Sequence, residues 1–174
     1  MRSIKGFILA LAGLFIMITL VSLLIPSKVV VSRGVVVNST SPLVFTEIAN
    51  LQNWKHWQPV FKTDSAKINF ITDSAGISNS CEWESNGKKN KLLITATTTN
   101  QITTSLLREG ENEVINIISI LPLTDSNQVQ VEWRAITKLK WFPWEKFYGI
   151  FIEKLTGSGY EEALNSLKTY VEAH

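Results

Sequence analysis

One stretch of the chain decides its fold: residues 128–155, QVQVEWRAITKLKWFPWEKFYGIFIEKL. Its first part alternates between apolar and polar residues, which is the period of two expected of a β-strand with one solvated face. Its second part carries large apolar residues at i, i+3, i+4, i+7, i+8 and i+11, the spacing of one helix face: Trp144, Phe147, Tyr148, Phe151, Ile152 and Leu155. The stretch therefore predicts a half-exposed sheet followed by a helix that covers it.

The period of two extends upstream over much of the chain. It predicts six strands, near residues 67–71, 79–85, 89–99, 102–108, 113–121 and 128–138. The dipeptide Asn86-Gly87 between the second and third has the composition of a tight hairpin turn. A run of β-branched residues at 29–37 predicts an earlier strand. Strands that alternate in this way form antiparallel sheets with one face in solvent.

Helical segments precede and follow the six strands. Ser41-Pro42 has the composition of a helix start, and the aromatic segment after it must end before Pro59. Residues 156–159, TGSG, predict an interruption of the C-terminal helix, with Ser158 and Glu161 at capping-box spacing to restart it. The element order predicts an α+β fold in which a curved antiparallel sheet grips a long, broken C-terminal helix.

The N-terminal segment has the properties of a membrane span. The 22 uncharged residues 6–27 would reach roughly 33 Å as a helix, which is enough to cross a bilayer core. A cleaved signal peptide is the alternative, but the apolar run is long and lacks a small-x-small cleavage site. We therefore predict an anchor at residues 1–27 and a ligand-binding domain at residues 28–174. Arg2 and Lys5 favour a cytoplasmic N-terminus and an extracytoplasmic domain.

The charge balance and the scarcity of ligating residues exclude several functions. Of 17 basic residues, Arg2 and Lys5 precede the span, so the remainder has 15 basic and 15 acidic residues and no charge to attract nucleic acid. The chain has one cysteine, Cys81, and two histidines, His56 and His174. We expect no metal site and no cofactor, because a metal site needs several such ligands close together.

No catalytic constellation emerges from the sequence. A nucleophilic system would have to use His56, and no serine elbow motif is present. Glu82 and Glu84 should lie on the sheet face opposite Trp83, in solvent. Tyr148, Glu82, Arg108 and His56 are the titratable groups that an enzyme would have to use, and we assign none of them as catalytic.

The aromatic residues are the candidate ligand-binding groups. Most are expected in the core, but some can line a cavity, whose walls are typically apolar and aromatic. Trp83 and Trp133 should face inward from the sheet, with Phe147 and Phe151 opposite them on the helix. Trp141, Phe142 and Trp144, flanked by Lys138, Lys140 and Lys146, instead have the composition of a bilayer interface. The predicted ligand-binding residues are Trp57, Phe61, Trp83, Trp133, Phe147, Tyr148 and Phe151.

These elements resemble those of the START-like (SRPBCC) superfamily, and within it the polyketide cyclase/dehydrase-like group. The resemblance covers about residues 29–172 and rests on the element order, the strand tryptophans Trp83 and Trp133, and the segments SPLVF (41–45), LQNWKHWQP (51–59) and GYEEALNSLK (159–168). It implies a helix-grip fold whose sheet and helix enclose an apolar cavity for lipids, sterols, polyketides or similar molecules. It carries no fixed catalytic set over to this chain.

Three functions are compatible with these features. The first is a membrane-tethered module that binds a hydrophobic small molecule or lipid in its cavity. The second is a polyketide cyclase/dehydrase-like enzyme that acts on an apolar substrate there, and it requires a buried titratable group with a shifted pKa. The third is a structural or interaction protein whose pocket is filled by its own side chains; its protein partners cannot be named from the sequence.

Overall fold

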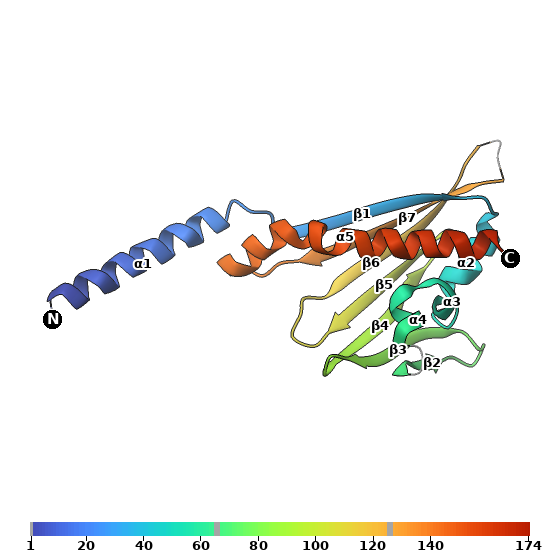
Figure 1. Ribbon diagram of the computed structural model, residues 1–174, viewed down its shortest axis with the longest axis horizontal. Helices are drawn as coiled ribbons and strands as arrows, with labels where there is room; N and C mark the ends of the chain where they lie inside the picture. Colours follow the sequence, from blue (N-terminus) through green and yellow to red (C-terminus); the bar gives the residue numbers. More distant parts are fainter. Residues whose placement is uncertain (1, 65–66, 125–126) are drawn as a thin grey trace.

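A seven-stranded sheet and a 30-residue helix build most of the domain, and a separate apolar helix extends from one end of it (Figure 1). The structure is a computed structural model that describes residues 2–64, 67–124 and 127–174. Its elements are α1 (Arg2–Ser22), β1 (Lys28–Val37), α2 (Ser41–Ala49), α3 (Trp54–Trp57), α4 (Pro59–Asp64), β2 (Asn69–Thr72), β3 (Ser78–Ser85), β4 (Lys88–Thr97), β5 (Gln101–Arg108), β6 (Val114–Pro122), β7 (Val129–Lys138) and α5 (Pro143–Glu172).

The sheet confirms the strands that the period of two predicts. All neighbouring strands are antiparallel, in the order β1-β7-β6-β5-β4-β3-β2, so that the first strand pairs with the last. In β7, Val131, Trp133 and Ala135 are buried while the residues between them are more exposed. Asn86 and Gly87 have φ values of 52° and 71°, as a tight hairpin turn requires. Register shifts in β2 and β4 mark irregularities of the kind that bends a sheet.

Helices α2, α3 and α4 close one end of the concave face with aromatic side chains. Trp54 packs against Trp57 and Trp133, with ring centroids 5.0 and 5.7 Å apart, and its indole nitrogen donates to the carbonyl of Ile48. Phe61 extends the cluster to Trp83, at 5.5 Å. Helix α3 ends at Trp57, before Pro59, as expected. Helix α2 begins at Ser41 and has Pro42 in its first turn, with Thr40 at the N-cap position.

Helix α5 is continuous, which corrects the predicted interruption at residues 156–159. Gly157 and Gly149 lie at close approaches instead: a Cβ at Gly157 would collide with the Arg33 guanidinium of β1, and one at Gly149 with the Leu139 side chain. Ser158 and Glu161 therefore lie inside a helix and not at a capping box. The glycines weaken the helix locally, but they allow it to approach β1 and the end of β7 closely.

Replacing Gly149 by leucine should lower the free energy of unfolding by about 1–3 kcal/mol, because the new side chain overpacks the contact with Leu139. Gly159 is the matched control, since a Cβ there meets nothing within 4 Å. Gly159→Ala should raise the unfolding free energy by up to about 1 kcal/mol through helix propensity. Urea denaturation followed by circular dichroism measures both changes. Equal effects at the two positions would contradict this packing role.

A buried lysine ties α5 to the segment that connects α1 with β1. Lys146 is 3% exposed, and its Nζ donates to the carbonyl of Ile25, at 3.0 Å, and to Oγ of Ser27. The backbone nitrogen of Leu139 also donates to the carbonyl of Ser27, at 2.8 Å. The junction between α1 and the domain is therefore held by specific hydrogen bonds, next to the first turn of α5.

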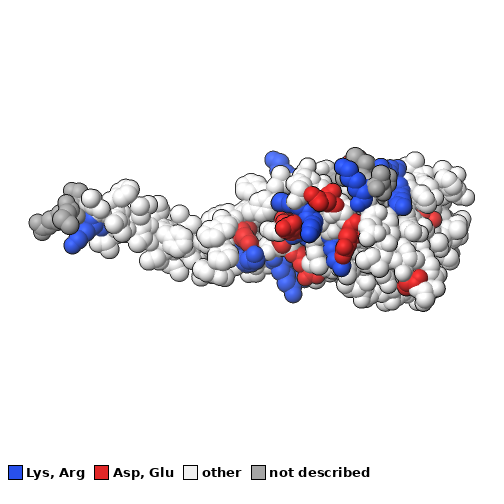
Figure 2. Space-filling model, turned by 90° about the horizontal axis from the view of Figure 1, so that it is seen from below, with Lys and Arg blue, Asp and Glu red and all other residues white. Residues whose placement is uncertain are grey.

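Helix α1 is long and apolar enough to cross a membrane. An 18-residue window within Ile4–Ser22 has a mean hydropathy of 2.4 and none of that window is buried, whereas Ser22, at the end next to the domain, is buried. Figure 2 shows a largely uncharged α1 and a domain on which acidic and basic side chains are interspersed on the face in view. Length and composition make α1 a candidate membrane span, although a signal sequence has the same properties.

Candidate functional site

A cavity of about 700 Å³ lies between the concave face of the sheet and residues 145–162 of α5. Its volume is within the range of small-molecule sites, roughly 300–1,000 Å³. Strands β3–β7 form its floor, and residues of α3–α4 and the β5–β6 turn border it. The apolar and aromatic lining residues are Val31, Trp54, Val60, Phe61, Trp83, Leu92, Leu106, Val114, Trp133, Ala135, Leu139, Tyr148, Ile152, Leu155 and Tyr160. The interior between sheet and helix is therefore not filled by the protein's own side chains.

Four of the seven predicted ligand-binding residues line this cavity: Phe61, Trp83, Trp133 and Tyr148. Trp57 does not. It is fully buried behind the wall, where it packs against Trp54 and Trp133. Phe147 and Phe151 do not line the cavity either, and they are 38% and 56% exposed. The structure thus brings the sheet aromatics and Phe61 together, and it leaves two of the three predicted helix aromatics outside.

The expectation that Phe147 and Phe151 face the sheet is wrong, and the reason is the packing of α5. The buried face of the helix is formed by Gly149, Ile152 and Gly157, with Ala163, Leu164 and Leu167 further along. A hydrophobic pattern alone assigns the largest apolar side chains to the inside, whereas here the glycines set the contact with the sheet. Trp144, Phe147 and Phe151 consequently form an exposed stripe beside the cavity, and Leu155, which is also exposed, lies at its edge.

One amide supplies a polar group inside the apolar walls. Asn116 of β6 lines the cavity, is 3% exposed, and accepts a hydrogen bond from Trp133 Nε1 to its Oδ1 at 3.1 Å. Sequence reasoning missed Asn116. Its signal was a polar residue at an inward position of a strand, between Val114 and Ile118. Such a residue is usually partnered when buried, which makes its surroundings informative.

Tyr160 of α5 lies on the other side of the same tryptophan. Its ring centroid is 5.3 Å from that of Trp133, and the residue lines the cavity. Burial raises the pKa of the Tyr160 hydroxyl, and the positive charge of Arg108 partly opposes this shift. The hydroxyl therefore keeps its proton at neutral pH and can donate a hydrogen bond.

Charged groups gather at the rim of the cavity, around the β5–β6 turn. Arg108 forms an ion pair with Glu111, at 3.5 Å. Asn112 donates to Glu145 at 2.9 Å and so connects the turn to α5. Partial burial opposes ionisation of Glu145, but hydrogen bonds from Asn112 and the Lys140 backbone outweigh it and lower the pKa of this carboxyl. These groups position the rim.

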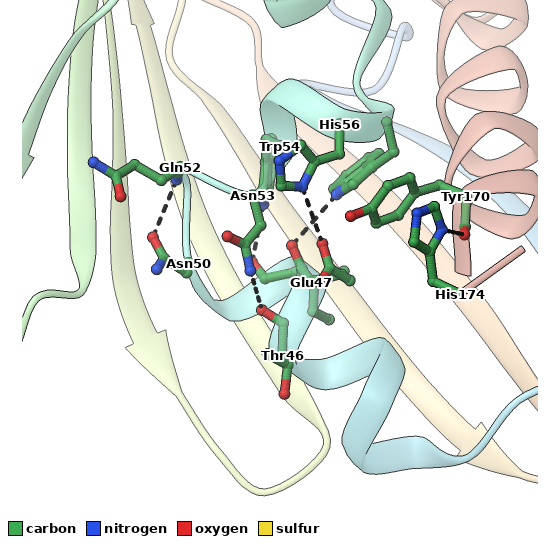
Figure 3. Close-up of polar contacts among 11 residues, drawn as sticks. Thr46, Glu47, Asn50, Gln52, Asn53, Trp54, His56, Tyr170 and His174 are labelled. Carbon is green, nitrogen blue, oxygen red and sulfur yellow. Dashed lines mark hydrogen bonds and ion pairs between the residues drawn. The ribbon is translucent and has the colours of Figure 1, made fainter.

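The two histidines both lie next to Tyr170 (Figure 3), and neither lines the cavity. His56 Nδ1 lies 3.7 Å from Glu47 Oε2, and its ring stacks on Tyr170 with centroids 5.1 Å apart. His174 packs on the same tyrosine, at 4.5 Å. In the described parts of the chain, no group of three or more potential ligands could hold a metal ion. Glu82 is on the outer face of β3, where it pairs with Lys91 at 2.7 Å.

Cys81 should be unreactive in the folded protein. Burial raises the pKa of its thiol to about 12; a hydrogen bond involving the backbone of Leu92 opposes the shift, and the Glu82 carboxylate adds to it. We expect iodoacetamide to leave native Cys81 unmodified at about pH 8 and to alkylate it in urea, because the thiolate is the nucleophile. The pKa of this thiol is about 9 in the unfolded chain and about 12 in the folded protein, so the free energy of unfolding is unaffected by its ionisation below about pH 9. Between pH 9 and pH 12 the thiol ionises only in the unfolded chain, and the free energy of unfolding falls. Equal alkylation of native and denatured chains would contradict the burial.

Comparison with known proteins finds the same architecture in solved structures. No family model and no curated protein matches the chain. A START superfamily protein from Mycobacterium smegmatis superposes with a TM-score of 0.63 at 18% identity, covering 83% of this chain and 98% of that one. CalU16 from Micromonospora echinospora gives 0.52 at 12%, covering 83% and 75%. DynU16, from the dynemicin biosynthetic locus, gives 0.55 at 11%, covering 82% and 47%.

At these identities the likeness concerns the fold and not the activity. The matched architecture is the curved antiparallel sheet closed by a long C-terminal helix, which the element order had predicted. The chain therefore has the helix-grip fold of START superfamily proteins, joined to an N-terminal apolar helix.

Proposed function

We propose that this protein is a membrane-tethered module that binds a lipid-like or other hydrophobic small molecule between its sheet and α5. The observation that carries the proposal is the cavity of about 700 Å³ with aromatic and aliphatic walls. A concave space of this size lined mainly by apolar and aromatic side chains has the properties of a small-molecule binding site. Binding an apolar ligand there would remove the exposed wall surface from water.

The polar groups of the cavity favour binding over catalysis. An acid–base catalyst works best with a pKa near the operating pH. The two cavity residues with shifted pKa values move away from neutrality: Tyr160 upward and Glu145 downward. Arg108 is already paired with Glu111. No specific residue of the described cavity lining therefore supports a polyketide cyclase/dehydrase-like activity, whereas the size and apolar walls of the cavity support a binding role.

The anchor and its junction support tethering to a membrane. If α1 spans a bilayer, the Lys146 contacts with Ile25 and Ser27 place the first turn of α5 near the lipid surface. Trp141, Phe142 and Trp144 are at that turn, with ring centroids 4.7 and 4.9 Å apart. Exposed tryptophans beside lysines, here Lys138 and Lys140, suit the headgroup region. We propose that this aromatic cluster rests on the extracytoplasmic surface.

Retention of α1 and the side of the domain can be tested in native membranes. The full chain should stay in the pellet after carbonate extraction with Met1 still attached, and protease added to intact cells or spheroplasts should degrade the domain. A shortened soluble chain would indicate a signal peptide. Protection of the domain until the membrane is opened would place it in the cytoplasm and contradict the proposed orientation.

Ligand binding can be tested with the full chain in lipid nanodiscs. We expect a long-chain naphthyl fluorophore to receive energy from the tryptophans well above the level seen with an unrelated single-span protein in the same nanodiscs. Mass spectrometry of extracts should also find an apolar compound that co-purifies in stoichiometric amount. The proposal is contradicted if energy transfer does not exceed that of the control protein and no apolar compound co-purifies.

A further inference from the structure

We infer that the ligand carries a neutral hydrogen-bond acceptor, a carbonyl-type oxygen of a ketone, ester or amide, and that this oxygen binds the side-chain amide of Asn116. The inference rests on the proposed function, because it specifies the chemistry of the ligand in the same cavity. It follows from the orientation of the Asn116 amide, from its two N–H donors that have no acceptor in the described parts of the protein, and from the charges around the cavity.

The orientation of the Asn116 amide is fixed by its partner. An indole N–H can only donate a hydrogen bond, so the atom that faces Trp133 Nε1 at 3.1 Å must be the amide oxygen and not the nitrogen. The Nδ2 group is therefore directed away from the indole. Trp133 is itself held among Trp54, Trp57 and Tyr160, which keeps this arrangement in place.

The two N–H donors of Asn116 have no acceptor within the described protein. The residue is 3% exposed and lines the cavity. In residues 2–64, 67–124 and 127–174, the fully enclosed side-chain atoms without a hydrogen-bond partner are Glu47 Oε2 and Thr104 Oγ1. Asn116 Nδ2 also has no hydrogen-bond partner among these residues, but it is not fully enclosed. Because the residue lines the cavity, this nitrogen is accessible from the open space. Buried donors are normally satisfied, and an acceptor on a ligand would satisfy these.

The charges around the cavity favour a neutral acceptor over a carboxylate. Arg108 is the one basic residue in the described lining, and Glu111 already pairs with it. Glu111 also pairs with Lys88, at 3.3 Å, and Glu145 pairs with Lys140, at 3.7 Å, so the basic groups at the rim already have carboxylate partners and a ligand carboxylate would have to compete with them. The Asn116 amide is a neutral donor among apolar walls, which is a suitable partner for a carbonyl oxygen.

The test compares three fluorescent ligands with the full chain in nanodiscs: a 6-dodecanoyl-2-aminonaphthalene ketone, its analogue with the carbonyl reduced to a methylene, and a carboxylate of similar chain length. Energy transfer from tryptophan reports binding, corrected for empty nanodiscs. The wild-type protein should bind the ketone about tenfold more tightly than either of the other two. Asn116→Leu should bind the ketone about tenfold more weakly and the methylene analogue as the wild type does.

Two further variants separate the amide from general effects on the fold. Asn116→Asp keeps an acceptor for Trp133, and its ionised carboxylate has no donor; at an alkaline pH, at which this buried carboxyl is ionised, the variant should also lose the preference for the ketone. Thr104→Val changes the neighbouring buried hydroxyl, opposite Asn116 on β5, and should leave the preference intact. Equal affinity of the wild type for ketone and methylene analogue would overturn this inference while leaving hydrophobic binding in place. Binding of none of the three ligands would overturn the proposed function as well.

Discussion

Gly159→Phe should abolish ligand binding while leaving the protein folded. Gly159 lines the cavity from α5, and a Cβ at this position meets nothing within 4 Å. The Cβ of a new side chain therefore has no neighbour to displace, and we expect the phenyl ring to extend into the open space of the cavity. Replacing a glycine inside a helix also improves helix propensity, by a few tenths of a kcal/mol or more. We expect at least a tenfold loss of affinity for the naphthyl ketone with no loss of stability.

Gly159→Ala is the matched control for this variant. Its methyl group occupies little of the cavity, so binding should stay within about twofold of the wild type. Tryptophan-to-ligand energy transfer measures binding, and urea denaturation measures stability on the same samples. Wild-type affinity in Gly159→Phe would show that the ligand does not occupy the space between sheet and α5. Loss of binding in both variants would point to a different role of the glycine.

Trp133→Ala should have the largest effect on stability. Trp133 is 3% exposed and contacts the rings of Trp54, Trp57 and Tyr160. Its truncation leaves a void and removes the partner of Asn116, so the free energy of unfolding should fall by about 3–5 kcal/mol. This is a large part of the roughly 5–15 kcal/mol that stabilises a typical domain.

Trp144→Ala makes the same chemical change at an exposed position. Trp144 is 61% exposed in the first turn of α5, and its replacement should alter the unfolding free energy by less than about 0.5 kcal/mol. Urea denaturation of both variants in nanodiscs, followed by far-ultraviolet circular dichroism, gives the comparison. Similar losses for the two substitutions would contradict the assignment of Trp133 as the centre of the core.

The strands and the order of elements could be predicted because their signals are local. Alternation along β7 requires only that one face be buried, and the Asn86-Gly87 turn requires only two positive φ values. The inward positions of Trp83 and Trp133 follow from the same alternation. These features depend on neighbours in the sequence, so the sequence contains enough information to predict them.

The rotation of α5 and the role of Asn116 could not be predicted, because both depend on distant residues. Gly157 is a close approach only because Arg33 lies opposite it, more than a hundred positions away in the chain. Read locally, its neighbourhood looks like a helix break. Asn116 is a donor to the cavity only because Trp133, on the adjacent strand, takes its oxygen. Neither the contact between Gly157 and Arg33 nor the hydrogen bond between Trp133 and Asn116 can be predicted from the spacing of residues along the chain.

Photolabelling with a diazirine-bearing long-chain ketone tests the central claim most directly. Irradiation of the full chain in nanodiscs, followed by peptide mapping, shows which residues the ligand contacts. We predict labels on the concave face and on the inner side of α5, around Trp83, Leu106 and Ile152, that excess unlabelled ketone removes. Labels confined to α1 and residues 141–144, with none on the concave face, would contradict an internal binding site.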